Sequence, residues 1–361
     1  MGDKRMYEFI PNYIVPPGDT IRETMEALNF PANEFAVRLS ITEQSLYRIL
    51  NGKQALSYKT ANKLELVTGV PANFWNRLES QYRERLEKES ELEELERDVE
   101  WLQKIPIKEL ENRGYINSKL DDKDKVRSVL SFFEVSSVEA FYGTCSSLPI
   151  VARKSCSYEV IPEIATTWIQ MGQIESAKAN VNHYNREVFL QNLDKIRELT
   201  ILPPEEFVPQ MTNLCAKSGV VLVLQKQLKG APFCGVTKWL NNKKAMIVLS
   251  LRGESADHFW FSFFHEAAHL ILHKSKQKVF IDSNNEEISD IEEEANSFAS
   301  NFLIPEKYII DLKCIRKRKD VTELAKLLKI DPSIVVGQYQ HYTEKWSFFN
   351  DLKVKYEWVK K

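Results

Sequence analysis

Cysteine is scarce in this chain of 361 residues, and its five cysteines are scattered. Their number is odd, and no two stand at the CxxC spacing. This pattern excludes a disulfide framework and a zinc site made of cysteine thiolates. The five are Cys145, Cys156, Cys215, Cys234 and Cys314.

Long apolar runs are absent as well, because His, Glu or Lys interrupts every apolar stretch well short of a membrane span. The first residues, MGDKRMYEF, include no apolar segment of a secretory signal. With only 12 Gly and 14 Pro, and with 43% hydrophobic residues, the composition is globular rather than disordered. We therefore expect a cytoplasmic protein with no membrane partner.

Neither sign of charge dominates, since the formal net charge is -2. Nothing draws the whole chain toward nucleic acid, so any contact with DNA must come from a local patch. A chain of this length is too long for one ordinary compact core, so two or three domains are expected.

Closely spaced helices are predicted for the first 80 residues. Asp19 and Thr20 are suitable N-caps for a helix, and Thr42 is a suitable N-cap for a later one that Asn51-Gly52 ends. Gly69-Val70-Pro71 marks a turn between two further helices. Residues 82–100 are highly charged and contain no helix breaker, which predicts a long exposed helix that joins two parts of the molecule.

The pattern changes after Leu202-Pro203-Pro204. The runs VVLVLQKQL and KAMIVLSLR are short and β-branched, with turn material between them, and predict a small sheet. The helical segments WFSFFHEAAHLILHK, EEISDIEEEANSFASNFLIP and VTELAKLLKIDPSIVVGQYQHY follow. The fold class expected is mainly α with a small β-sheet (α+β). The expected domains are residues 1–82, a charged linker helix at 83–104, a helical middle region at 105–200, and a C-terminal domain at 201–361.

The motif HEAAH carries the clearest chemistry. His265 and His269 stand four residues apart, so they project from one face of a helix and can bind one zinc ion. Glu266 lies one step round the helix and can act as general base toward a water molecule at the metal. The aromatic segment from Phe259 to Phe264 predicts a buried, dry setting. The competing interpretation is a pair of structural histidines with Glu266 in a salt bridge.

A catalytic zinc ion needs a third protein ligand, and the next helix offers three glutamates in a row. Glu294 lies four residues before Phe298 and so falls nearest to the apolar face, whereas Glu292 falls toward solvent. Glu293 stays open as an alternative to Glu294. His273 extends the histidine face by one turn. It is either a hydrogen-bond donor behind the metal ligands or a contact to the transition state, or else a plain surface histidine.

Residues 33–53 have the proportions of a helix-turn-helix motif, with two short helices and a tight turn. In that motif the second helix enters the major groove of DNA. The side chains expected there are Thr42, Gln44, Ser45 and Arg48, with Lys53 against a phosphate. Residues 31–60 hold only four basic groups against two acidic ones, so a helical bundle for protein contacts is the alternative. A homodimer would double the positive charge and ease this objection.

Residues 13–85 resemble the HigA-type antitoxins of the Xre (lambda-repressor-like) class. The resemblance rests on the PPG leader, the segment RILNGK and the tail TANKLE…GVPANFW. It implies a lambda-repressor-like helical domain that binds operator DNA. Ser40 departs from the family, because the turn usually carries glycine at that position.

The segments WFSFFHEAAHLILH and EEEANSFASNFLIP resemble the ImmA/IrrE family of metallopeptidases. HEAAH differs from the commoner HELGH only at two positions that bind no metal. The resemblance implies a zincin-like domain with Zn²⁺ held by His265, His269 and Glu294, the residue before Ala295-Asn296, and with Glu266 as general base.

Together these patterns predict a transcriptional regulator, antitoxin-like in its DNA-binding part, with a zinc-dependent endopeptidase domain. Its substrate would be a protein, either a repressor or a partner toxin, as the resemblance implies. The alternative is a non-proteolytic antitoxin that represses its operon and neutralises a toxin, with a structural or sensory metal site.

Overall fold

The computed structural model describes residues 16–146, 161–230, 233–273 and 285–359. The chain divides into two compact units, residues 1–99 and 100–361. None of the described helices is long and apolar enough to cross a membrane.

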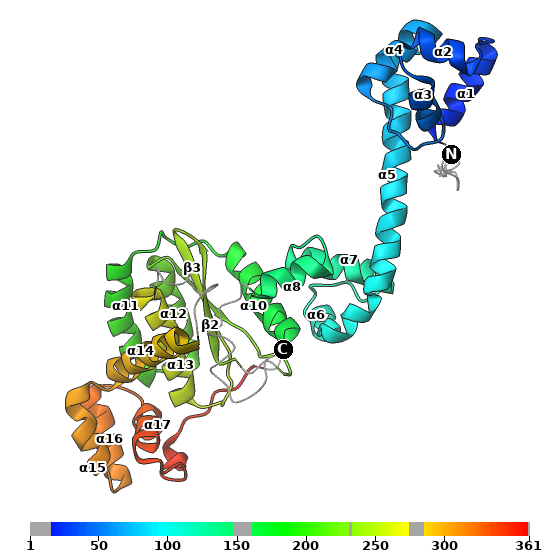
Figure 1. The fold of residues 1–361 in the computed structure, drawn as a ribbon. Coiled ribbons are helices and arrows are strands. Elements are labelled where there is room, and N and C mark those ends of the chain that lie inside the picture. Colours follow the sequence, from blue (N-terminus) through cyan, green and yellow to red (C-terminus); the bar gives the residue numbers. More distant parts are fainter. Residues whose placement is uncertain (1–15, 147–160, 231–232, 274–284, 360–361) are drawn as a thin grey trace, which may run out of the picture. The chain divides into compact units, whose positions relative to one another are not determined.

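In its described residues, 16–99, the first unit consists of helices and their connecting turns and has its own core (Figure 1). Phe35, Leu46, Leu64 and Trp75, one from each of the last four helices, are almost completely buried in that core, and Ile21 of the first helix joins them. The helices are α1 (Pro17–Ala27), α2 (Ala32–Arg38), α3 (Glu43–Leu50), α4 (Tyr58–Thr68) and α5 (Ala72–Arg97).

Local sequence explains most boundaries in this unit. Thr42 is the N-cap of α3, as predicted, and its hydroxyl accepts a hydrogen bond from the Ser45 amide at 3.1 Å. Helix α1 begins earlier than predicted, because Pro17 occupies its first position and has no amide hydrogen to satisfy. Gly18 lies directly against the backbone of Leu50, where a Cβ atom would overlap it.

The turn before α3 has the left-handed backbone that glycine usually supplies. Ser40 adopts φ of 48° there, and the Lys63 ammonium donates a hydrogen bond to its carbonyl at 3.0 Å. The turn geometry of the helix-turn-helix motif is thus kept without glycine, at a conformational cost of roughly 1 kcal/mol.

Helix α5 runs without interruption through residue 82 and is followed by the 3₁₀ helix η1 (Asp98–Lys104). The predicted boundary between the first domain and the linker helix therefore lies inside one helix. The predicted boundary at residue 200 also lies inside the second unit. Two helices of the expected middle region, α10 (Pro162–Lys178) and α11 (Arg186–Glu198), pack with the sheet and its helices. The compact units thus differ from the four segments expected.

The second unit contains a three-stranded sheet and helices on both of its faces. Its strands are β1 (Val220–Leu224), β2 (Gly235–Asn241) and β3 (Lys244–Leu249). Its helices are α6 (Ile107–Asn112), α7 (Asp122–Phe133), α8 (Val138–Ser146), α10 (Pro162–Lys178), α11 (Arg186–Glu198), η2 (Leu199–Ile201), α12 (Pro204–Lys217), α13 (Ala256–Leu272), α14 (Asn285–Leu303), η4 (Glu306–Tyr308), α15 (Ile309–Cys314), α16 (Arg318–Leu328), α17 (Pro332–Thr343) and η5 (Asn350–Leu352).

The strand order is β1-β3-β2, with β1 parallel and β2 antiparallel to β3. The predicted apolar runs form β1 and β3. Strand β2 lies between these two runs, where only turn residues are predicted, because its sequence GVTKWLN has no apolar run to mark it. In the described sheet β2 is an edge strand.

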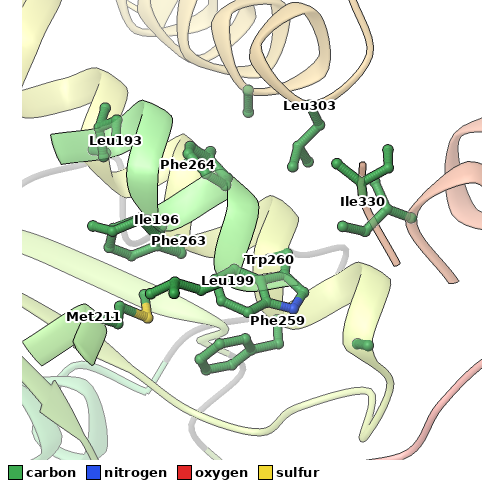
Figure 2. Close-up of a cluster of buried hydrophobic side chains, with 14 of the residues drawn as sticks. Leu193, Ile196, Leu199, Met211, Phe259, Trp260, Phe263, Phe264, Leu303 and Ile330 are labelled. Atoms are coloured by element: carbon green, nitrogen blue, oxygen red, sulfur yellow. The ribbon is translucent and has the colours of Figure 1, made fainter. Parts of the chain in front are cut away.

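Helices cover both faces of the sheet (Figure 1), and the side chains of β3 alternate between these two layers. Ala245, Ile247 and Leu249 join the core with α11, α12 and α13, while Met246 and Val248 contact α10 on the other face. Helix α13 supplies much of the first layer: Phe259, Trp260, Phe263 and Phe264 lie among residues from α11, α12 and α14 (Figure 2). Each such side chain stabilises the fold by roughly 1.5–3 kcal/mol.

The C-terminal segment fixes the start of α13. The Ala256 amide donates to Val354 O at 2.9 Å, and the Tyr356 amide donates to Glu254 O at 2.8 Å. The Lys353 ammonium lies 2.7 Å from a carboxylate oxygen of Asp257, in the first turn of the helix. The beginning of α13 is therefore held by residues almost 100 positions later.

Candidate metal centre and helix-turn-helix surface

His265 and His269 lie on the face of α13 that does not enter the apolar core. Their Nε2 atoms are 3.1 Å apart and point to one place, and their side chains are only 12% and 5% exposed. Nδ1 of His265 lies 2.9 Å from the Asn296 amide oxygen, to which it can donate a hydrogen bond. That bond puts the proton on Nδ1 and leaves Nε2 as a lone-pair donor for a metal.

Glu292 of α14 completes the cluster. One carboxylate oxygen is 3.3 Å from His265 Nε2 and the other is 3.4 Å from His269 Nε2. Candidate ligand atoms of these three residues all lie within 4.8 Å of one another. The structure therefore brings Glu292 to the histidine pair, and not Glu294 or its open alternative Glu293.

Helix phase explains this correction. The buried residues of α14 near the site are Ile291, Ala295 and Ala299, spaced by four, whereas Phe298 is only partly buried. Glu292 follows the first of them, as Asn296 follows the second. The prediction of Glu294 relied on Phe298 to mark the buried face. Glu292 and Glu294 are two residues apart, so their side chains differ in direction by about 200° around the helix.

The three residues fit a zinc ion chemically. Two imidazole nitrogens and one carboxylate are a common donor set for catalytic zinc, which leaves one position open. Oε1 of Glu292 is buried and has no hydrogen bond among the described residues, so a cation would satisfy it. Burial alone would raise the pKa of Glu292, but His265 and His269 lower it to about 2, which keeps this carboxylate ionised.

Glu266 sits beside this cluster and is itself buried, with 7% of its surface exposed. Its side chain lies against β2, where a Cβ atom added to Gly235 would be 2.9 Å from Oε1. Burial raises the pKa of Glu266, although the neighbouring His265 and His269 oppose this. A carboxylate with a raised pKa is suited to general-base catalysis near neutral pH.

The end of α13 is anchored by side chains that sequence reasoning did not single out. The Tyr184 hydroxyl donates to Leu270 O, and the Arg186 guanidinium donates to Ile271 O, each at 3.1 Å. These bonds satisfy two carbonyls of the last turn. They fix the last turn of the helix, which carries His269 and is followed directly by His273.

In the N-terminal unit, the predicted base-reading residues lie on an accessible face of α3. Gln44 and Arg48 are exposed, as are Thr42 and Lys53, while Ser45 is partly buried. The Gln54 amide donates a hydrogen bond to the Ser45 hydroxyl at 3.2 Å. Ser45 is thus held in place by a residue of the following loop, which the sequence reading missed.

Two family models match the chain. The model of a helix-turn-helix domain matches residues 21–75, and the model of the IrrE N-terminal-like domain, of peptidase family M78, matches residues 221–336. The chain is also 38% identical over 64 residues to YddM, an uncharacterised HTH-type transcriptional regulator of Escherichia coli K12. The aligned part is 18% of this chain and 68% of that regulator.

Proposed function

Because the chain belongs to the helix-turn-helix transcriptional regulators and carries an IrrE-like domain of peptidase family M78, we propose that it couples DNA binding to zinc-dependent cleavage of a protein partner. The partner would be a repressor or a toxin. The observation that carries the peptidase part is the convergence of His265, His269 and Glu292 beside the buried Glu266.

A zinc ion at this cluster would supply a Lewis acid that polarises a peptide carbonyl and lowers the pKa of a nearby water. Glu266 would take the proton from the attacking water and pass it to the leaving amine. The Thr237 hydroxyl donates to Glu266 O at 3.0 Å, so β2 and α13 hold the base in a fixed place.

The position of β2 favours an extended peptide segment as substrate. It is the edge strand of the described sheet, and Gly235 lies against the Glu266 side chain. An extended chain that pairs with an edge strand gains main-chain hydrogen bonds whatever its sequence. A peptide along β2 would pass the catalytic carboxylate.

For the DNA-binding part, we propose that α3 lies in the major groove and that the protein acts as a homodimer. Gln44 and Arg48 would contact base edges, with Thr42, Ser45 and Lys53 nearby. Two copies of α3 would then meet half-sites about one helical turn apart.

The peptidase proposal is tested with Glu266→Gln, which keeps the shape of the side chain and removes the base. We expect the variant to bind zinc like the wild type. New protein N-termini should accumulate in cells with the wild type and not with Glu266→Gln. If both strains give the same N-termini, proteolysis is not the function, and the non-proteolytic antitoxin takes its place.

The DNA proposal is tested by gel shift on the DNA upstream of the protein's own coding sequence. Gln44→Ala and Arg48→Ala should each weaken binding about 5- to 150-fold, as loss of a base contact worth about 1–3 kcal/mol implies. Arg77→Ala, which removes an exposed cation from α5, is the matched control. Equal binding by the Arg48→Ala and Arg77→Ala variants would exclude α3 as the reading helix.

A further inference from the structure

His273 is buried, with 1% of its surface exposed, although it follows the last residue of α13. Its Nδ1 lies 3.1 Å from Nδ1 of His269, one turn earlier. Its Nε2 lies 2.8 Å from Oε2 of Glu294 on α14. One imidazole thus connects a candidate metal ligand to a carboxylate on the neighbouring helix.

The direction of these two hydrogen bonds follows from the chemistry of imidazole. If His269 binds a metal through Nε2, its proton is on Nδ1, and that N–H must donate. Nδ1 of His273 is then the acceptor, so a neutral His273 carries its proton on Nε2. That N–H donates to the Glu294 carboxylate, which can only accept when ionised.

We propose that His273 is a positioning residue that fixes the tautomer and the ring orientation of His269, and that Glu294 in turn fixes His273. The proposal rests on the proposed zinc site, and it gives Glu294 a role in place of direct ligation. Such outer partners of a metal-bound histidine typically change metal affinity 10- to 100-fold when they are removed.

The geometry also explains why His273 and Glu294 should contribute unequally to zinc affinity. His273 and His269 are both buried, so a lost bond leaves the His269 N–H without a partner in a dry place. The Glu294 side chain is 54% exposed, and water can replace it at His273. Removal of Glu294 should therefore weaken zinc binding less than removal of His273.

The test measures the dissociation constant of Zn²⁺ for the full chain by competition with a chromophoric chelator. His273→Ala should weaken binding about 10- to 100-fold. His273→Asn places an amide oxygen where Nδ1 lies, so it should restore most of the lost affinity. Glu294→Gln should weaken binding severalfold, and its effect should vanish in the His273→Asn background, where no imidazole contacts residue 294.

Glu293→Gln is the matched control, since it removes the same charge from the adjacent exposed position. Nitrogen-15 NMR of the zinc-loaded wild type should show the proton of His269 on Nδ1. The positioning role is refuted if His273→Ala binds zinc within twofold of the wild type, or if Glu294→Gln and Glu293→Gln have equal affinities. If instead the wild type binds no zinc, or if His265→Ala binds it equally well, the proposed zinc site is wrong, and this inference is wrong with it.

Discussion

The ion pair between Lys353 and Asp257 offers a direct measurement of how the C-terminal segment holds α13. The two side chains are 14% and 7% exposed, and their charged atoms are 2.7 Å apart. Lys353→Met keeps most of the aliphatic stem and removes the ammonium. The Asp257 carboxylate would then be buried with the Ser255 hydroxyl as its remaining side-chain hydrogen-bond partner among the described residues.

The expected loss of stability can be worked out from this environment. Breaking a buried pair by removing one partner costs about 3–5 kcal/mol. Asp257 lies in the first turn of α13, where the helix dipole favours a negative charge by about 0.3–1 kcal/mol. Subtracting the larger of these values leaves about 2–4 kcal/mol in the free energy of unfolding of the second unit.

Urea unfolding followed by tryptophan fluorescence measures this loss, because Trp260 is buried in the same helix. With a slope of about 3 kcal/mol per molar, the midpoint should fall by roughly 1 M. Lys355→Met, an exposed lysine two residues later, is the control and should leave the midpoint unchanged. The double variant Asp257→Asn/Lys353→Met should recover part of the loss. A change below about 0.5 kcal/mol for Lys353→Met, typical of a surface position, would show that this ion pair does not hold the start of α13.

Three further predictions concern the two sites. Gly235→Ala should reduce proteolysis while zinc affinity is kept, because the new Cβ would lie 2.7 Å from Cγ of Glu266 and must displace the base; equal loss of zinc would contradict this. Gly18→Ala should lower the melting temperature of the first unit and weaken DNA binding, since the methyl group meets the backbone of Leu50, and overpacking costs about 1–3 kcal/mol. Zinc binding should release no proton from Glu292, whose pKa is about 2. Calorimetry in buffers of different ionisation enthalpy counts the protons released at each pH. A step in that number at the ordinary pKa of a glutamate, about 4.3, would refute the assignment.

Local signals in the sequence predicted the helices well, because caps and breakers act on their own neighbours. Thr42 and the Gly69-Val70-Pro71 turn lie where they were expected, and α13 and α14 follow their apolar patterns. The histidine pair could be placed on one helix face for the same reason: the spacing of four residues is sufficient. The fold class, mainly α with a small sheet, is confirmed.

Long-range pairings could not be read in this way. Lys353 and Asp257 are far apart in sequence, and nothing near either residue indicates the other. Which glutamate lies beside the histidine pair depends on which face of α14 is buried. The large Phe298 suggested one face, but it is only partly buried, and small buried residues such as Ala295 mark another. Strand β2 has no apolar run of its own, so only its pairing with β3 reveals it.

The most direct test of the zinc site is anomalous scattering at the zinc edge from crystals of the full chain loaded with zinc. We expect one strong peak about 2.0–2.2 Å from Nε2 of His265, from Nε2 of His269 and from a carboxylate oxygen of Glu292. A peak bound by Glu294 in place of Glu292, or no peak at the two histidines, would contradict it.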